Sequence, residues 1–71
     1  MTPAQIKKHA AIFLFLDAQA GHAFVLGDER TMDFYLESRN ALGTVIREAN
    51  HQAWLRLHRG RFVPTPATQP A

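Results

Sequence analysis

One pair of side chains in this 71-residue chain has a type and a spacing that suit metal binding. Glu48 and His51 are three residues apart, so a continuous helix would place both on one face. Ferritin-like carboxylate centres combine two Glu-x-x-His steps with glutamates from two further helices. A symmetric dimer would supply the two steps, but the first apolar segment offers only Asp17 and no glutamate. We therefore interpret Glu48 and His51 as a solvated polar face and predict no metal site.

A second group of residues, basic and aromatic, lies toward the C-terminus. Arginines alternate with aromatic and apolar side chains over residues 54–62, and residues 49–71 contain no carboxylate side chain. An antiparallel helical hairpin would bring two N-terminal lysines to the same end. The candidate nucleic-acid-binding residues are then Lys7, Lys8, Arg56, Arg59 and Arg61.

Two other interpretations of residues 54–62 remain open. The arginines can complement the dipole at a helix C-terminus while Trp54 and Leu57 pack inside, and we favour this structural interpretation. The same stretch can also lie on an anionic membrane surface. The net charge of +2 is too small to indicate strong, non-specific binding to a polyanion.

Enzymatic chemistry has no support in the residue types present. The chain has no cysteine, its single serine (Ser38) lacks a glycine-elbow context, and its four glycines form no phosphate-binding loop. We predict that the protein is not an enzyme, with no catalytic residue, no cofactor and no metal.

The hydrophobic pattern predicts two helices that position these groups. Thr2 to Gln5 reads as a capping box, which starts a helix over residues 3–20 that ends at Gly21. An apolar stripe at steps of three and four predicts a second helix over residues 28–59. Gly43 within it indicates either close approach of another helix or a bend. Residues 21–27 could form an extended segment, a short helical turn or an ordered loop, and we favour an apolar loop packed over the end of the bundle.

The predicted fold is all-α: a helical hairpin that dimerises into a four-helix bundle. Residues 1–63 form the single domain, and the proline-rich residues 64–71 form a flexible, disordered tail. The apolar run at residues 10–16 would cover every side of a helix. A domain this small buries only ~60% of its unfolded surface, so a second copy or another molecule is expected to cover the remainder.

These observations favour a protein–protein interaction module. We expect a homodimer that binds and modulates another protein, as small bacterial or phage accessory regulators and inhibitors do; a nucleic-acid-binding regulator is the alternative. Asp17 is expected to pair with a cation or to stay hydrated at the edge of the bundle. The candidate partner-binding residues are Ile12, Leu14, Phe15, Phe24, Leu26 and Trp54.

Polar residues in and after the first apolar segment bear on whether the protein inserts into a membrane. Asp17, Gln19 and His22 interrupt the apolar stretch before it reaches the ~20 residues that a bilayer requires, so no stable membrane insertion is expected. The N-terminus superficially resembles a signal peptide, but removal of residues 1–20 would leave little core. We therefore expect a cytoplasmic protein.

Overall fold

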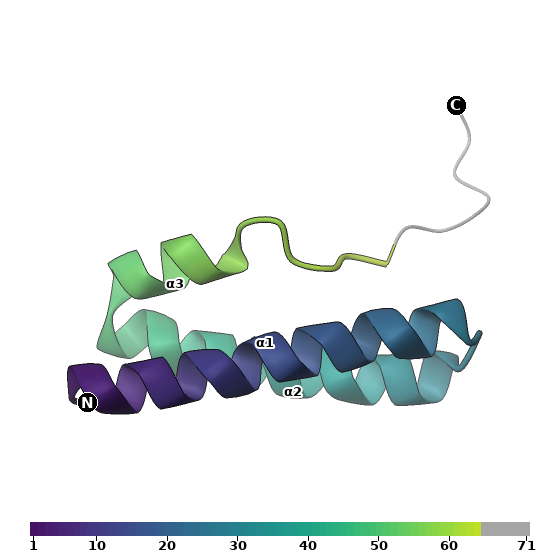
Figure 1. Ribbon diagram of the computed structural model, residues 1–71, viewed down its shortest axis with the longest axis horizontal. Coiled ribbons are helices and arrows are strands. Elements are labelled where there is room, and N and C mark those ends of the chain that lie inside the picture. Colours follow the sequence, from purple (N-terminus) through teal and green to yellow (C-terminus); the bar gives the residue numbers. More distant parts are fainter. Residues whose placement is uncertain (65–71) are drawn as a thin grey trace.

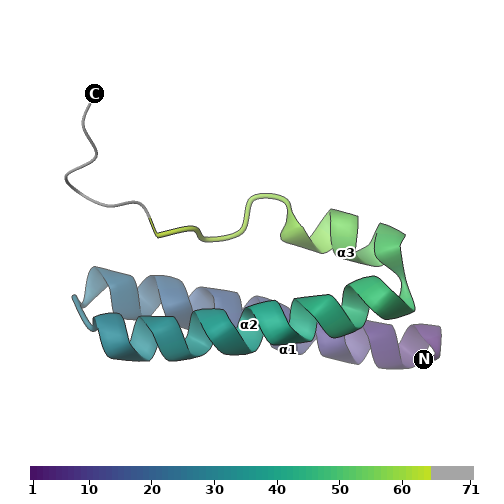
Figure 2. The same cartoon turned by 180° about the vertical axis from the view of Figure 1, so that it is seen from behind.

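The computed structural model describes residues 1–64, which form three helices and no strand: α1 (Pro3–Val25), α2 (Glu29–Ala49) and α3 (His51–His58). The predicted all-α class is confirmed for these residues. α1 and α2 form an antiparallel hairpin, and α3 folds back over one face of it (Figures 1 and 2). The segment after α3 (residues 59–64) then runs along the same face toward the hairpin turn. Most of the predicted tail, residues 65–71, lies outside the described residues.

α1 starts as the sequence predicts but ends later. The Thr2 Oγ1 accepts a hydrogen bond from the Gln5 N–H at 3.2 Å, and the Gln5 side chain accepts one from the Thr2 N–H at 2.8 Å. The predicted end at Gly21 is wrong, because α1 continues to Val25. The last turns of α1 bury Ala20 and Ala23. This packing compensates for Gly21, because a glycine inside a helix costs about 1 kcal/mol relative to alanine.

The turn between α1 and α2 is shorter than the expected loop over residues 21–27, so that prediction is also wrong. Gly27 has a φ of +76°, the left-handed conformation that ends a helix. The Asp28 N–H donates to the Ala23 carbonyl at 2.9 Å and the Gly27 N–H to the Phe24 carbonyl at 3.0 Å, which is a Schellman motif. Asp28 then caps α2 by accepting from the Thr31 N–H at 3.1 Å.

The predicted continuous helix over residues 28–59 is wrong, because the chain breaks at Asn50. Asn50 is extended, with φ −157° and ψ 96°, and its side chain accepts from the Ala53 N–H at 3.1 Å. Asn50 therefore ends α2 and caps α3. The break also puts Glu48 and His51 in different helices, so the single helical face expected for them does not form.

Two small apolar clusters form the core, one toward each end of the hairpin. The first has Phe13, Ile46 and Ala53 at its centre, and the second has Ala20, Ala23 and Met32. Gly43 allows α1 and α3 to pack closely against α2 and does not mark a bend. A Cβ at this position would lie 3.0 Å from the Phe13 ring and 3.4 Å from the Trp54 Nε1. The partly buried residues packed around the two clusters are Ile6, Leu42, Trp54 and Leu57 for the first, and Tyr35, Leu36 and Phe62 for the second.

An ion pair between the clusters attaches the segment after α3 to the hairpin. Arg39 of α2 donates to the Asp17 Oδ1 of α1 at 2.7 Å, and both side chains are nearly buried. Asp17 also accepts from the Phe62 N–H at 3.0 Å, and Arg39 donates to the Phe62 carbonyl at 2.6 Å. Asp17 thus pairs with a cation, one of its two expected outcomes.

Candidate interaction surfaces

One face of the hairpin is not covered by any described part of the chain. Phe13 lies against Gly43 and Asp17 binds Arg39, which sets the register of α1 on α2. α3 and the segment after it contact the side of α1 that carries Ile6, Ala10 and Gly21. Helical geometry at about 100° per residue therefore turns the opposite side of the hairpin away from α3.

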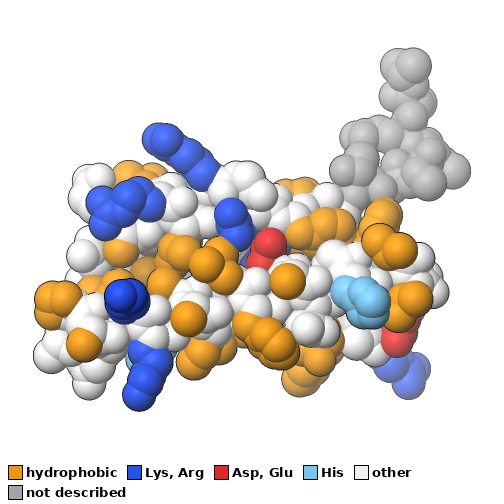
Figure 3. Space-filling view, in the orientation of Figure 1, with side chains coloured by type: hydrophobic (Ala, Val, Ile, Leu, Met, Phe, Trp, Pro, Cys, Tyr) orange, Lys and Arg blue, Asp and Glu red, His pale blue; other side chains and the backbone are white. Residues whose placement is uncertain are grey.

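Four large apolar side chains occupy this opposite side, which we call the open face. Ile12 and Phe15 of α1 have 47% and 57% of their surface exposed, and Phe34 and Val45 of α2 have 63% and 44%. By the register above, Ile12 lies level with the turn of α2 that carries Val45. Figure 3 shows hydrophobic side chains along the edge of the molecule farthest from α3.

The structure separates the predicted partner-binding residues into different surroundings. Ile12 and Phe15 lie on the open face, whereas Leu14, 40% exposed, points away from it. Trp54 is half-buried and packs against the first core cluster.

The other two predicted partner-binding residues lie at the turn end. The Phe24 ring packs on the Phe62 ring at 5.3 Å between centroids, and Leu26 is 69% exposed at the end of α1. Together with Val25, which is 81% exposed, they form an apolar group that we call the turn group.

Sequence reasoning missed Phe34 and assigned Val45 to the core stripe. The sequence does contain a signal for Phe34. Phe34 is about half a turn around α2 from Gly43, which faces the core, so its side chain lies on the opposite side of the helix. An apolar side chain off the buried stripe of a helix is the pattern that marks a second contact face.

The five predicted basic residues do not form one patch. Lys7 of α1 and Arg56 of α3 line one groove of about 390 Å³ with an apolar floor that includes Ile6 and Leu57, so the expected meeting of these chain segments is observed. Arg61 instead lies 3.9 Å from the Asp17 Oδ2, at the middle of the hairpin. Lys8 and Arg59 are exposed. Neither residue lines this groove, and neither forms an ion pair with Asp17.

Charge is distributed unevenly along the hairpin. The turn end carries Asp28, Glu29 and Asp33, all exposed, with Arg30 among them. The other end carries Lys7 and, beside it, the exposed Arg56 of α3. Figure 3 shows most of the visible Lys and Arg side chains over the α3 end. The molecule therefore has an acidic end and a basic end.

No protein-family model matches this chain, and no curated protein or solved structure is detectably similar to it. Within residues 1–64, no three His, Asp or Glu side chains gather where a metal ion could bind. None of the helices in that range is long and apolar enough to cross a membrane. A function for this protein must therefore be inferred from the geometry of its surfaces.

Proposed function

We propose that this protein is a homodimeric helical protein–protein interaction module that binds and modulates another protein. In this proposal two hairpins pack open face against open face and form a four-helix bundle. The observation that carries it is the open face itself, where four large apolar side chains are 44–63% exposed on one side of the hairpin. Apolar surface gathered on one side of a small domain is typical of an interface.

A second copy suits the open face better than an unrelated helix. Residues from both helices contribute to the face, so a two-fold axis would supply matching rows from the other copy. Antiparallel packing would also bring the basic end of one copy, with Lys7, over the acidic end of the other, with Asp28 and Glu29. This charge complementarity favours the antiparallel orientation over the parallel one.

The oligomeric state tests this proposal directly. Light scattering of the purified chain is expected to give the mass of a dimer. Phe15→Lys should give a monomer, because a cation would have to be buried at the interface. Val25→Lys is the matched control: Val25 lies at the C-terminus of α1, where a cation is favourable, and off the open face. A monomeric wild-type chain, or a dimer that persists in Phe15→Lys with normal helical content, would contradict the proposal.

The turn group (Phe24, Val25 and Leu26) is the surface that we propose for the regulated protein. It lies at one end of the hairpin, so it stays accessible when the open face is covered. Leu26→Ser is expected to abolish capture of a partner from cells that express the protein, with the dimer intact. Ile12→Ser, on the open face, should weaken the dimer instead. Capture that survives Leu26→Ser would exclude the turn group.

The alternative function, binding of nucleic acid, is supported by one observation: Lys7 and Arg56 line the same groove. If this groove binds phosphates, a salt-sensitive shift of DNA or RNA should be lost in Lys7→Ala/Arg56→Ala. Arg30→Ala, an exposed arginine at the acidic end, is the matched control. A shift that depends equally on Arg30, or no shift at low salt, would dispose of this alternative.

A further inference from the structure

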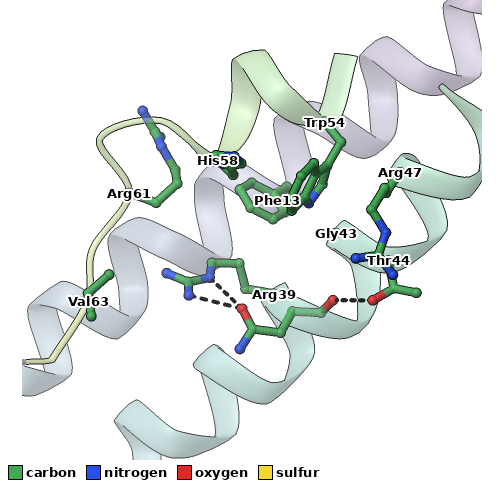
Figure 4. A pocket seen from close by; sticks show the side chains of 10 residues that line it. Phe13, Arg39, Gly43, Thr44, Arg47, Trp54, His58, Arg61 and Val63 are labelled. Carbon is green, nitrogen blue, oxygen red and sulfur yellow. Dashed lines mark hydrogen bonds between the residues drawn. The ribbon is translucent and has the colours of Figure 1, made fainter. Parts of the chain in front are cut away.

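A pocket of about 280 Å³ lies on the side of the hairpin that faces α3, away from the open face (Figure 4). Its apolar wall consists of Phe13, Gly43 and Trp54. α2, α3 and the segment after α3 supply the rest of the lining, so the folding back of α3 creates the pocket. The pocket is near the lower end of the volumes typical of small-molecule sites.

Positive charge dominates the lining of this pocket. Arg39, Arg47 and Arg61 all line it, and no aspartate or glutamate does. Among the described residues, only Asp17 forms ion pairs with these arginines, with Arg39 at 2.7 Å and with Arg61 at 3.9 Å. One carboxylate cannot neutralise three guanidinium groups. The pocket therefore retains a surplus of positive charge in a partly desolvated hollow, which attracts an anion.

The hydrogen-bond donors at the pocket are partly committed and partly free. The Asn40 Oδ1 accepts from the Arg39 Nε at 3.1 Å and from its Nη2 at 2.9 Å (Figure 4). This pair orients the Asn40 amide, whose NH₂ group donates to no other group in residues 1–64. Arg47 makes no hydrogen bond or ion pair in the same range.

Aromatic contacts hold the free cation in place. The Arg47 guanidinium lies 5.5 Å from the centre of the Trp54 ring, a cation–π distance. His58 meets the same Trp54 ring edge-on at 4.3 Å between centroids. Both groups are therefore positioned before a ligand arrives, which lowers the entropic cost of binding.

We propose that this pocket binds a phosphate group, either as inorganic phosphate or as the monoester of a small molecule. Phosphate accepts hydrogen bonds on several oxygens and suits planar guanidinium donors such as Arg47 and Arg61. The Asn40 amide NH₂ supplies a neutral donor to the same group. The apolar wall formed by Phe13 and Trp54 leaves room beside the phosphate for an uncharged substituent. This site is independent of the proposed dimer.

Trp54 is the only tryptophan of the chain and lines the pocket, so its fluorescence reports on binding there. We would titrate the full chain with sodium phosphate and with phenyl phosphate, at constant ionic strength set by sodium chloride. A saturable change in fluorescence is expected with both probes. Tighter binding of phenyl phosphate would assign the site to phosphate monoesters, and equal or weaker binding would assign it to inorganic phosphate.

Variants locate the binding site. Arg47→Gln should weaken phosphate binding at least about tenfold, because it removes a charge-assisted donor. Arg56→Gln, in the separate groove with Lys7, should leave the affinity unchanged. Amide NMR would confirm that Arg47→Gln is folded and that phosphate shifts the Gly43 amide and the Asn40 side chain. A change that does not saturate, that chloride reproduces, or that Arg47→Gln leaves intact would overturn the proposal.

Discussion

Arg39 keeps its charge inside the fold because its guanidinium donors are nearly all used. Its partners are the carboxylate of Asp17, the carbonyl of Phe62 and the side-chain oxygen of Asn40. A buried cation with such partners is tolerated, but the same cation without its carboxylate is costly. The ion pair thus holds α1, α2 and the segment after α3 in one arrangement.

Removal of the carboxylate should therefore destabilise the protein strongly. We expect Asp17→Asn to lower the free energy of unfolding by about 3 kcal/mol, since Arg39 is left as an unpaired buried charge. Urea denaturation followed by circular dichroism measures this loss. The double variant Asp17→Asn/Arg39→Gln should recover part of it. If the two single substitutions add without any coupling, the ion pair does not have this role.

Asp28 links pH to the start of α2. Hydrogen bonds from Thr31 hold the pKa of Asp28 below its ordinary value of 3.8. The folded chain therefore binds this proton less readily than the unfolded chain does. The contribution of the cap is present above the unfolded pKa and is lost as the pH falls through the folded pKa.

An NMR titration is expected to show this linkage. The midpoint for the Asp28 carboxyl should lie below 3.8, and the Thr31 amide should titrate with the same midpoint. In Asp28→Ala the Thr31 amide should lose that transition. A Thr31 amide that ignores the Asp28 carboxyl would rule out the cap.

At the scale of the helices, two glycines in similar settings have different roles. Both are inside helices, where alanine would be preferred by about 1 kcal/mol. At Gly43 an added methyl would lie 3.0 Å from the buried Phe13 ring, which has little room to move. At Gly21 it would make ordinary contact with the Phe62 ring at 3.8 Å. Packing therefore opposes alanine at one position only.

Gly21→Ala and Gly43→Ala should consequently change stability in opposite directions. We expect Gly21→Ala to raise the free energy of unfolding by about 0.5–1 kcal/mol. Gly43→Ala should lower it by about 1 kcal/mol, because overpacking of 1–3 kcal/mol exceeds the helix gain. Thermal and urea unfolding compare the two directly. A stabilised Gly43→Ala would mean that Phe13 and Trp54 can withdraw from α2.

On the scale of the whole molecule, the two proposed sites lie on opposite sides of the hairpin. α3 and the segment after it cover one side and create the phosphate pocket, and the open face occupies the other. Within residues 1–64 a single helix, α3, packs on the hairpin formed by α1 and α2, so one side of the hairpin is covered and the other is not. Dimer formation and phosphate binding can therefore be tested separately.

Substitutions on each side should therefore act independently. Phe15→Lys is expected to abolish the dimer and to leave the phosphate affinity within about twofold of wild type, because distant sites behave additively. Arg47→Gln should do the reverse, with weak phosphate binding and an intact dimer. Light scattering and Trp54 fluorescence on the same samples measure both properties. One variant that loses both would show that the sites are coupled.

The amino-acid sequence alone determines those features of this protein whose causes are local. The Thr2 capping box acts within a few residues and predicts the observed start of α1. The apolar periodicity predicts helix on both sides of the turn, which is observed, but it does not predict the break at Asn50. Asp17, a charge on an apolar face, likewise indicates a partner before that partner is known. The distinction between core and exposed apolar residues on α1 follows from helical geometry in the same way.

Tertiary structure decided the features that depend on distant segments. A continuous apolar stripe favours one long helix, whereas the structure breaks at Asn50. Packing of Ala53 and Trp54 onto the first core cluster favours the folded-back α3 over that long helix. Arg39 finds its carboxylate 22 residues away along the chain. The phosphate pocket combines side chains from all three helices and from the segment after α3. Such contacts arise from the joint packing of segments, and no local pattern of residues encodes them.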